Sequence, residues 1–95
     1  MLFETMADVE VGKSAGAWLK AQREAEGLSR RDVAERVGLT YHIFVDHVEA
    51  GNGRIRAEEL TRWADALRVE RVEFVKRLRG FDDAPRRVEA ELVEA

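Results

Sequence analysis

The chain of 95 residues contains no cysteine and a single proline, Pro85. Without thiols, disulfide bonds and cysteine-bound zinc are excluded, and packing alone must stabilise the fold, as in proteins of a reducing cytosol. No apolar run approaches the roughly 18 residues of a membrane-spanning helix, and no basic flank precedes an apolar stretch at the N-terminus. These absences predict a soluble, cytoplasmic protein of one domain, without a membrane partner.

Sequence signatures of catalysis are also missing. There is no nucleophile elbow, no phosphate-binding glycine loop followed by Lys and Ser or Thr, and no HExxH motif. His42 and His47 are five residues apart, so they lie on diverging faces of a helix, and no third ligand is placed to complete a zinc site. We therefore expect no enzymatic activity, no metal and no cofactor, and we interpret Ser14 and Ser29 as helix caps.

Basic residues are fewer than acidic residues in the whole chain, which has a formal net charge of -3. Its distribution is uneven, because 14 Lys and Arg stand against 11 Asp and Glu between Lys13 and Gly80, whereas residues 1–12 and 81–95 are acidic. A nucleic-acid-binding surface needs a local excess of positive charge rather than a basic chain. The middle of the chain is therefore compatible with such a surface.

Helix-forming segments separated by glycines make up most of the chain. Apolar residues recur with a helical period, which predicts an all-α fold of five short helices within residues 13–80. The helices are expected at residues 14–26, 29–38, 40–48, 60–67 and 70–80. Their expected core residues are Trp18, Leu19, Ala25, Val33, Ala34, Val37, Phe44, Val45, Val48, Leu60, Trp63, Ala64, Leu67, Val72, Phe74, Val75 and Leu78.

Capping signals mark the ends of these helices. Ser29 and Asp32 form a capping-box pattern, Thr40 precedes the third helix, and Glu70 is a weaker cap for the fifth. Glycines punctuate the chain at Gly12, Gly16, Gly27, Gly38, Gly51, Gly53 and Gly80, which is typical of short helices. The stretch from residue 52 to residue 56 is expected to be a basic loop.

The flanks are less regular than the middle of the chain. Residues 1–12 form an N-terminal arm that is either ordered or disordered, since its apolar residues follow no period. Residues 81–95 form either an acidic tail or a dimerisation helix, because Val88 and Leu92 are one turn apart.

The second and third helices are short and are joined by a tight turn after Gly38, which is the pattern of a helix-turn-helix. In this motif the second of the two helices enters the major groove of DNA, which is about 12 Å wide. Its inner side chains hold it on the core, and its outer side chains meet base edges. We expect Phe44, Val45 and Val48 to face inward.

The segment LSRRDVAERVGLTYHIFVDHVEAGNGRI, which starts at Leu28, resembles the Cro/XRE family of phage and bacterial repressors. The matching positions are Ser29, Val33, Ala34, Gly38, Val48, Glu49 and Gly51. The resemblance covers residues 14–80 and implies a five-helix repressor-like domain. It also implies operator binding as a two-fold dimer and repression of nearby genes, in a phage-related or autoregulatory setting. Finally, it implies a structural ion pair between Arg23 and Glu49.

The chain departs from the family pattern at three points. Arg30 replaces the usual Gln after the first cap, and it keeps a donor that can reach phosphate. The interval from Gly38 to Glu49 is one residue longer than the common spacing. Asp46 places a carboxylate near the groove, where it can only accept a hydrogen bond, for example from cytosine N4.

The DNA-binding residues expected from these arguments come from the second helix, the third helix and the basic loop. They are Arg30, Thr40, Tyr41, His42, Ile43, Asp46, His47, Asn52, Arg54 and Arg56. The arginines and the backbone N–H groups of Asn52 and Gly53 would contact phosphates. Tyr41 has two interpretations, since its ring can cover the core edge or its hydroxyl can reach phosphate. A pair between His42 and Asp46 would raise the histidine pKa and couple DNA affinity to pH.

The acidic flanks and Asp46 also fit an alternative function. On the same scaffold, an antitoxin or an adaptor would bind a protein partner instead of an operator. The dependence of binding on salt separates the two functions, because phosphate contacts make affinity fall steeply as the salt concentration rises.

Overall fold

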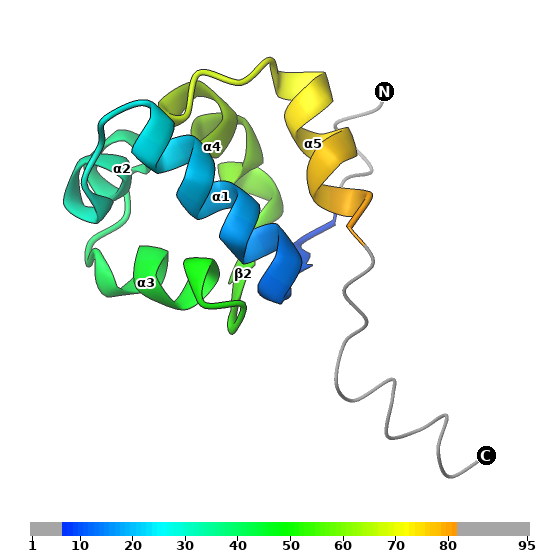
Figure 1. The fold of residues 1–95 in the computed structure, drawn as a ribbon, viewed down its shortest axis with the longest axis horizontal. Coiled ribbons are helices and arrows are strands. Elements are labelled where there is room, and N and C mark those ends of the chain that lie inside the picture. Colours follow the sequence, from blue (N-terminus) through cyan, green and yellow to red (C-terminus); the bar gives the residue numbers. More distant parts are fainter. Residues whose placement is uncertain (1–6, 82–95) are drawn as a thin grey trace, which may run out of the picture.

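The structure is a computed structural model that describes residues 7–81, and within this range five α-helices surround a common core. In chain order the elements are β1 (Val9–Val11), α1 (Lys13–Ala25), α2 (Arg30–Val37), α3 (Ile43–Glu49), β2 (Gly53–Ile55), the 3-10 helix η2 (Ala57–Glu59), α4 (Leu60–Ala66) and α5 (Arg71–Arg79). Figure 1 shows α2 and α3 on one side of the domain and α5 on the other, with α1 between them. The expected five-helix fold is confirmed. The proposed helix containing Val88 and Leu92 lies outside the described residues.

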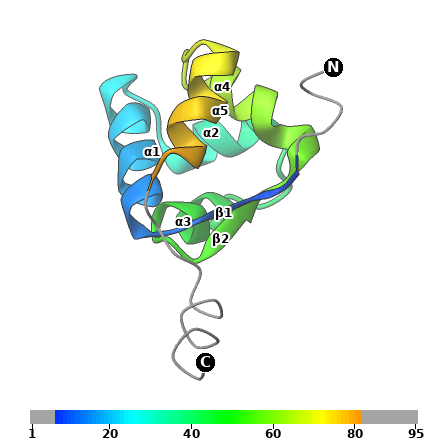
Figure 2. The same ribbon diagram turned by 90° about the vertical axis from the view of Figure 1, so that its right-hand side faces the viewer.

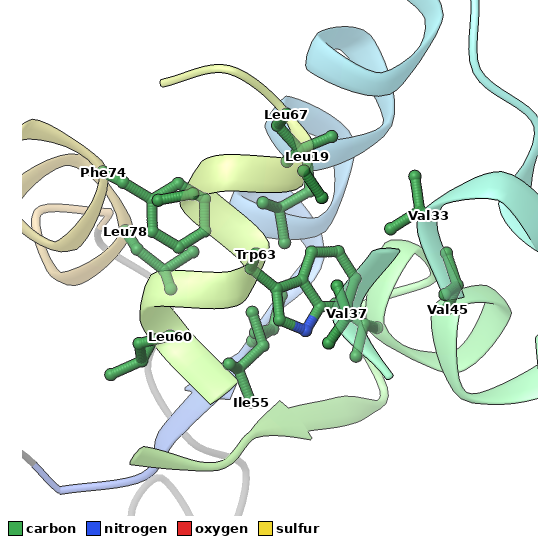
Figure 3. Close-up of a cluster of buried hydrophobic side chains, with 14 of the residues drawn as sticks. Leu19, Val33, Val37, Val45, Ile55, Leu60, Trp63, Leu67, Phe74 and Leu78 are labelled. Carbon is green, nitrogen blue, oxygen red and sulfur yellow. The ribbon is translucent and has the colours of Figure 1, made fainter. Parts of the chain in front are cut away.

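Trp63 of α4 is the centre of the core, with 1% of its surface exposed. Figure 3 shows its ring between apolar side chains of α2 and α3 on one side and those of α5 on the other. Its fully buried companions include Leu19, Val33, Val37, Val45, Ile55, Leu60, Leu67 and Phe74. Full burial of one such side chain contributes about 1.5–3 kcal/mol. Because every helix supplies at least one of them, the helix-turn-helix is fixed by the same core as the rest of the domain.

A two-stranded antiparallel sheet is the feature that the helical pattern did not predict. Val9 lies opposite Ile55, and Val11 lies opposite Gly53. Val11 and Ile55 are both buried and join the core, and Figure 2 shows the sheet beside α3. Part of the expected arm is therefore a strand, and the expected loop contains one. Strands of three residues are too short to show an alternating apolar pattern, which explains why the sequence did not reveal them.

The capping box at the start of α2 forms as the sequence predicts. The backbone N–H of Asp32 donates to Ser29 Oγ (3.0 Å), and the backbone N–H of Ser29 donates to the Asp32 carboxylate (2.9 Å). The second of these bonds holds the pKa of Asp32 below its usual value. Glu70 caps α5 by accepting two backbone N–H bonds. The interpretation of Ser14 as a cap is wrong, since the N-cap of α1 is Gly12.

Some of the residues expected in the core lie at its rim or on the surface. Ala25 is exposed because it stands off the stripe of α1 that meets the core, and Val72 is exposed in the first turn of α5. Trp18 is half-buried, and its ring packs against Phe74 (5.7 Å between centroids) and Phe81 (5.9 Å). The indole therefore fastens α5 to α1 from the rim of the core.

No helix within residues 7–81 is both long enough and apolar enough to span a bilayer.

Candidate nucleic-acid interface

The turn between α2 and α3 is short and is set by one glycine. Gly38 ends α2 with a left-handed φ of +94°, and its N–H donates to the carbonyl of Ala34 (2.9 Å). Helix α3 begins at Ile43, later than expected, and its N-cap His42 makes no side-chain capping bond. Thr40 is exposed in the turn and does not cap α3, so that prediction was wrong. The two helices nevertheless have the short-turn arrangement of a helix-turn-helix.

Helix α3 is seated directly on the backbone of α1. A Cβ placed on Gly16 would lie 2.5 Å from the carbonyl oxygen of Glu49 and 2.7 Å from that of Val48, closer than atoms can pack. Only glycine therefore allows the two helices to approach so closely. This contact fixes the height and the orientation of α3 relative to the core.

The inner face of α3 consists of Val45, Val48 and Glu49, which are 0%, 4% and 8% exposed. The expectation that Phe44 also faces inward was wrong, because 47% of its surface is exposed. Because Glu49 is buried together with Val45 and Val48, the face of α3 that meets the core is turned about the helix axis away from Phe44. Phe44 therefore lies on the outer flank. There its ring lies beside that of Tyr41, with centroids 6.3 Å apart.

The outer face of α3 and the preceding turn carry most of the predicted base-contacting residues. Tyr41 is 63% exposed and Ile43 is 45% exposed, and His42 and His47 are also exposed. Of the two interpretations of Tyr41, the structure favours the accessible one, since its ring does not cover the core. Figure 1 shows α3 along an edge of the domain, with no described element outside it. The face is therefore open to a large partner.

Glu49 and Arg23 form the ion pair that the resemblance implied. Arg23 Nε lies 2.6 Å from Glu49 Oε2, and Arg23 Nη2 donates to Glu49 Oε1 (3.1 Å). Arg23 Nη1 also donates to the carbonyl of Leu28 (2.8 Å). The hydrogen bond to Glu49 raises the pKa of Arg23 above its usual value. This buried fork joins α1, α3 and the chain before α2.

Arg30 connects the same buried carboxylate to the surface. Its Nε donates to Glu49 Oε1 (3.1 Å) and lies 3.2 Å from Asp46 Oδ1. The single Nε hydrogen is directed at Glu49, so the contact with Asp46 is an ion pair without a hydrogen bond, and this oxygen has no hydrogen-bond partner. Asp46 is thus joined to Arg30, and the expected pair with His42 is not formed.

The residues after α3 are only partly in the expected positions. The side chains of Arg54 and Arg56 are exposed, and each lies near a carboxylate: Arg54 Nε is 3.7 Å from Asp8, and Arg56 Nη2 is 3.0 Å from Glu58. The backbone N–H of Asn52 donates to the carbonyl of His47 (2.9 Å). That N–H is therefore not free to bind phosphate, which corrects the prediction made for it.

Two residues near the site were missed at the sequence level. Phe44 belongs to the exposed face, and the buried Arg23–Glu49 pair was the signal that could have placed it there. Asp8 accepts a hydrogen bond from the backbone N–H of Ala57 (2.8 Å) besides pairing with Arg54. No periodic signal in residues 1–12 pointed to Asp8. Among residues 7–81, no group of three or more His, Asp or Glu side chains is placed to hold a metal ion.

Comparison with known proteins agrees with this geometry. Residues 14–76 match the family model described as a helix-turn-helix domain. A similar solved structure is the restriction-modification controller protein C.AhdI from Aeromonas hydrophila, with 32% sequence identity and a TM-score of 0.57. The match covers 63% of this chain and 89% of that protein. No curated protein sequence matches the chain. The chain therefore belongs to the helix-turn-helix family of the Cro/XRE type, and it is a DNA-binding regulator rather than an enzyme.

Proposed function

We propose that the protein is a transcriptional repressor that binds an inverted-repeat operator as a homodimer and regulates genes near its own. The observation that carries this proposal is the exposed face of α3, held from behind by Val45, Val48 and Glu49. A helix supported in this way can enter the major groove without deforming the domain. The similarity to a protein named as a controller also supports a regulatory role.

The arginines around α3 supply the phosphate contacts in this proposal. The side chains of Arg30, Arg54 and Arg56 are 43%, 61% and 63% exposed. Arg54 and Arg56 pair with exposed carboxylates, and such pairs stabilise a protein by about 1 kcal/mol at most. Phosphate can therefore replace these partners at little cost. Arg30 Nε stays beside Glu49 and Asp46, and its Nη hydrogens would bind phosphate.

The dimer is inferred from the small size of the reading surface. One α3 helix of seven residues contacts too few base pairs to select a single site in a genome. Two copies related by a two-fold axis double the contacts and require two half-sites of opposite direction.

Selection of bound duplexes from a random-sequence pool tests the operator and the dimer together. We expect the recovered duplexes to contain an inverted repeat whose half-sites are about 10 base pairs apart, or a multiple of that spacing. Analytical ultracentrifugation of the complex should give two chains per duplex. Enrichment of a single unrepeated half-site bound by one chain would contradict the dimer but not DNA binding.

Alanine variants at three exposed positions test the proposed face. On the recovered duplex, His42→Ala and His47→Ala should each weaken binding roughly tenfold, because each base contact contributes about 1–3 kcal/mol. Arg54→Ala should weaken all sequences alike and reduce the slope of log affinity against log salt by about 1. Arg71→Ala is the matched control, since Arg71 is an exposed arginine paired with Asp65 outside the helix-turn-helix. Unchanged binding in all three variants would contradict the proposed face.

An antitoxin or adaptor remains the second candidate, and one observation favours it. The exposed side chains of Tyr41, Ile43 and Phe44 could bury against a protein instead of DNA. Binding to a protein would depend weakly on salt, whereas operator binding should fall by orders of magnitude between about 50 and 200 mM salt.

A further inference from the structure

The first turn of α3 and the residues just before it expose large apolar side chains. Within residues 7–81, four large hydrophobic side chains are exposed. Three of them lie within four positions of the chain: Tyr41, Ile43 and Phe44. We call these three residues the apolar patch. The fourth is Val72 on α5, outside the helix-turn-helix. Clustering of this kind points to a contact surface rather than to scattered surface residues.

The charges around the apolar patch are arranged so that they do not oppose DNA. Helix α3 carries two carboxylates, and each forms an ion pair with an arginine. Glu49 is buried against Arg23, and Asp46 lies 3.2 Å from Arg30. The other exposed residues from Thr40 to Ala50 are Thr40, His42, His47 and Ala50, and none of them carries a negative charge. The patch can therefore approach a negatively charged duplex.

The chemistry of the patch limits what it can recognise in the groove. Ile43 and Phe44 have neither donors nor acceptors in their side chains, so they cannot take part in the hydrogen-bond code of the bases. Among the groups on the major-groove edges, the C5-methyl of thymine is the apolar one. Contact with that methyl removes apolar surface from water on both sides.

We propose that the apolar patch is a specificity determinant that selects thymine at defined steps of each half-site by contact with the C5-methyl group. The proposal rests on the operator-binding function above and adds to it the identity of the bases read by this part of α3. Phe44 and Ile43 make the contacts, and the ring of Tyr41 supports that of Phe44 at 6.3 Å.

Replacement of thymine by uracil tests the proposal, because it removes only the methyl group. The probe is the duplex recovered by selection from the random pool, synthesised with thymine or with deoxyuridine at one position at a time. We expect uracil to weaken binding roughly fourfold for each contacted methyl, which corresponds to the burial of one carbon group. The effect should be confined to one or two positions in each half-site.

Variants assign the effect to the patch. In Phe44→Ala and Ile43→Ala, the ratio of affinities for the thymine and uracil duplexes should fall toward one. Val72→Ala should keep the full ratio, since it removes the same kind of exposed apolar side chain from α5. Because all three residues are 39–47% exposed, circular dichroism should show unchanged folding.

Each other result counts against the proposal in its own way. Equal affinity for thymine and uracil duplexes overturns the assignment while leaving operator binding intact. Tighter binding when the cytosines carry a 5-methyl group overturns the choice of thymine as the source of the methyl. Failure to recover any duplex, together with capture of a protein through Phe44, overturns the operator function itself and thymine reading with it.

Discussion

Replacing Glu49 by alanine is expected to lower the free energy of unfolding by about 3–5 kcal/mol. The substitution leaves Arg23, a residue that is 8% exposed, without the carboxylate that its Nε faces at 2.6 Å. The carbonyl of Leu28 and the exposed carboxylate of Glu24, 3.9 Å from Nη2, stay near the guanidinium but do not replace the two hydrogen bonds to Glu49. A buried charge that has lost its main partner cannot recover its hydration, and arginine does not escape by losing its proton. Since a domain of this kind is stable by about 5–15 kcal/mol, the loss is a large fraction of the total.

Urea unfolding followed by circular dichroism measures this effect. Arg30→Ala is the control, because it removes another partner of Glu49 from a side chain that is 43% exposed and should cost much less. The double variant Arg23→Met with Glu49→Leu should regain much of the lost stability, since it leaves no unpaired charge. An unchanged unfolding midpoint for Glu49→Ala, with only DNA affinity lost, would contradict the structural role of the pair.

The helices and the family could be predicted from the sequence because both depend on local patterns. The capping box of Ser29 and Asp32 and the glycine at position 38 act within one turn of helix, so their residues are close in the chain. The pairing of Val9 with Ile55 depends instead on residues far apart. Three-residue strands give no periodic signal, so the sheet became visible only in three dimensions.

The candidate site was predicted less completely than the fold. The helical period placed Val45 and Val48 inward, but it could not decide which flank of α3 faces out. That choice depends on Glu49, a charged residue whose burial follows from Arg23 on another helix. The environment of Arg30 depends in the same way on two carboxylates of α3. Contacts between helices thus decided what a single helix could not.

Gly16 illustrates the same limit and leads to the second large effect. The sequence places Gly16 inside the first expected helix, as the structure does, but it does not show how closely α3 approaches that position. Alanine normally stabilises an exposed helix interior by about 1 kcal/mol relative to glycine. Here the new Cβ would lie 2.5 Å from the carbonyl oxygen of Glu49 and 2.7 Å from that of Val48. Both are backbone atoms of α3, so they cannot rotate away as the end of a flexible side chain would.

Gly16→Ala is therefore expected to destabilise the domain by about 3 kcal/mol, at the upper end of the range for overpacked sites. Gly27→Ala is the matched control. Its φ of +70° is costly for alanine, but no atom lies within 4 Å of its Cβ, and the cost should be about 1–2 kcal/mol. Urea unfolding of both variants gives the comparison. If Gly16→Ala were as stable as the parent protein, α1 and α3 would have to be free to separate. The exposed face of α3 would then lack the rigid support from which base recognition has been inferred.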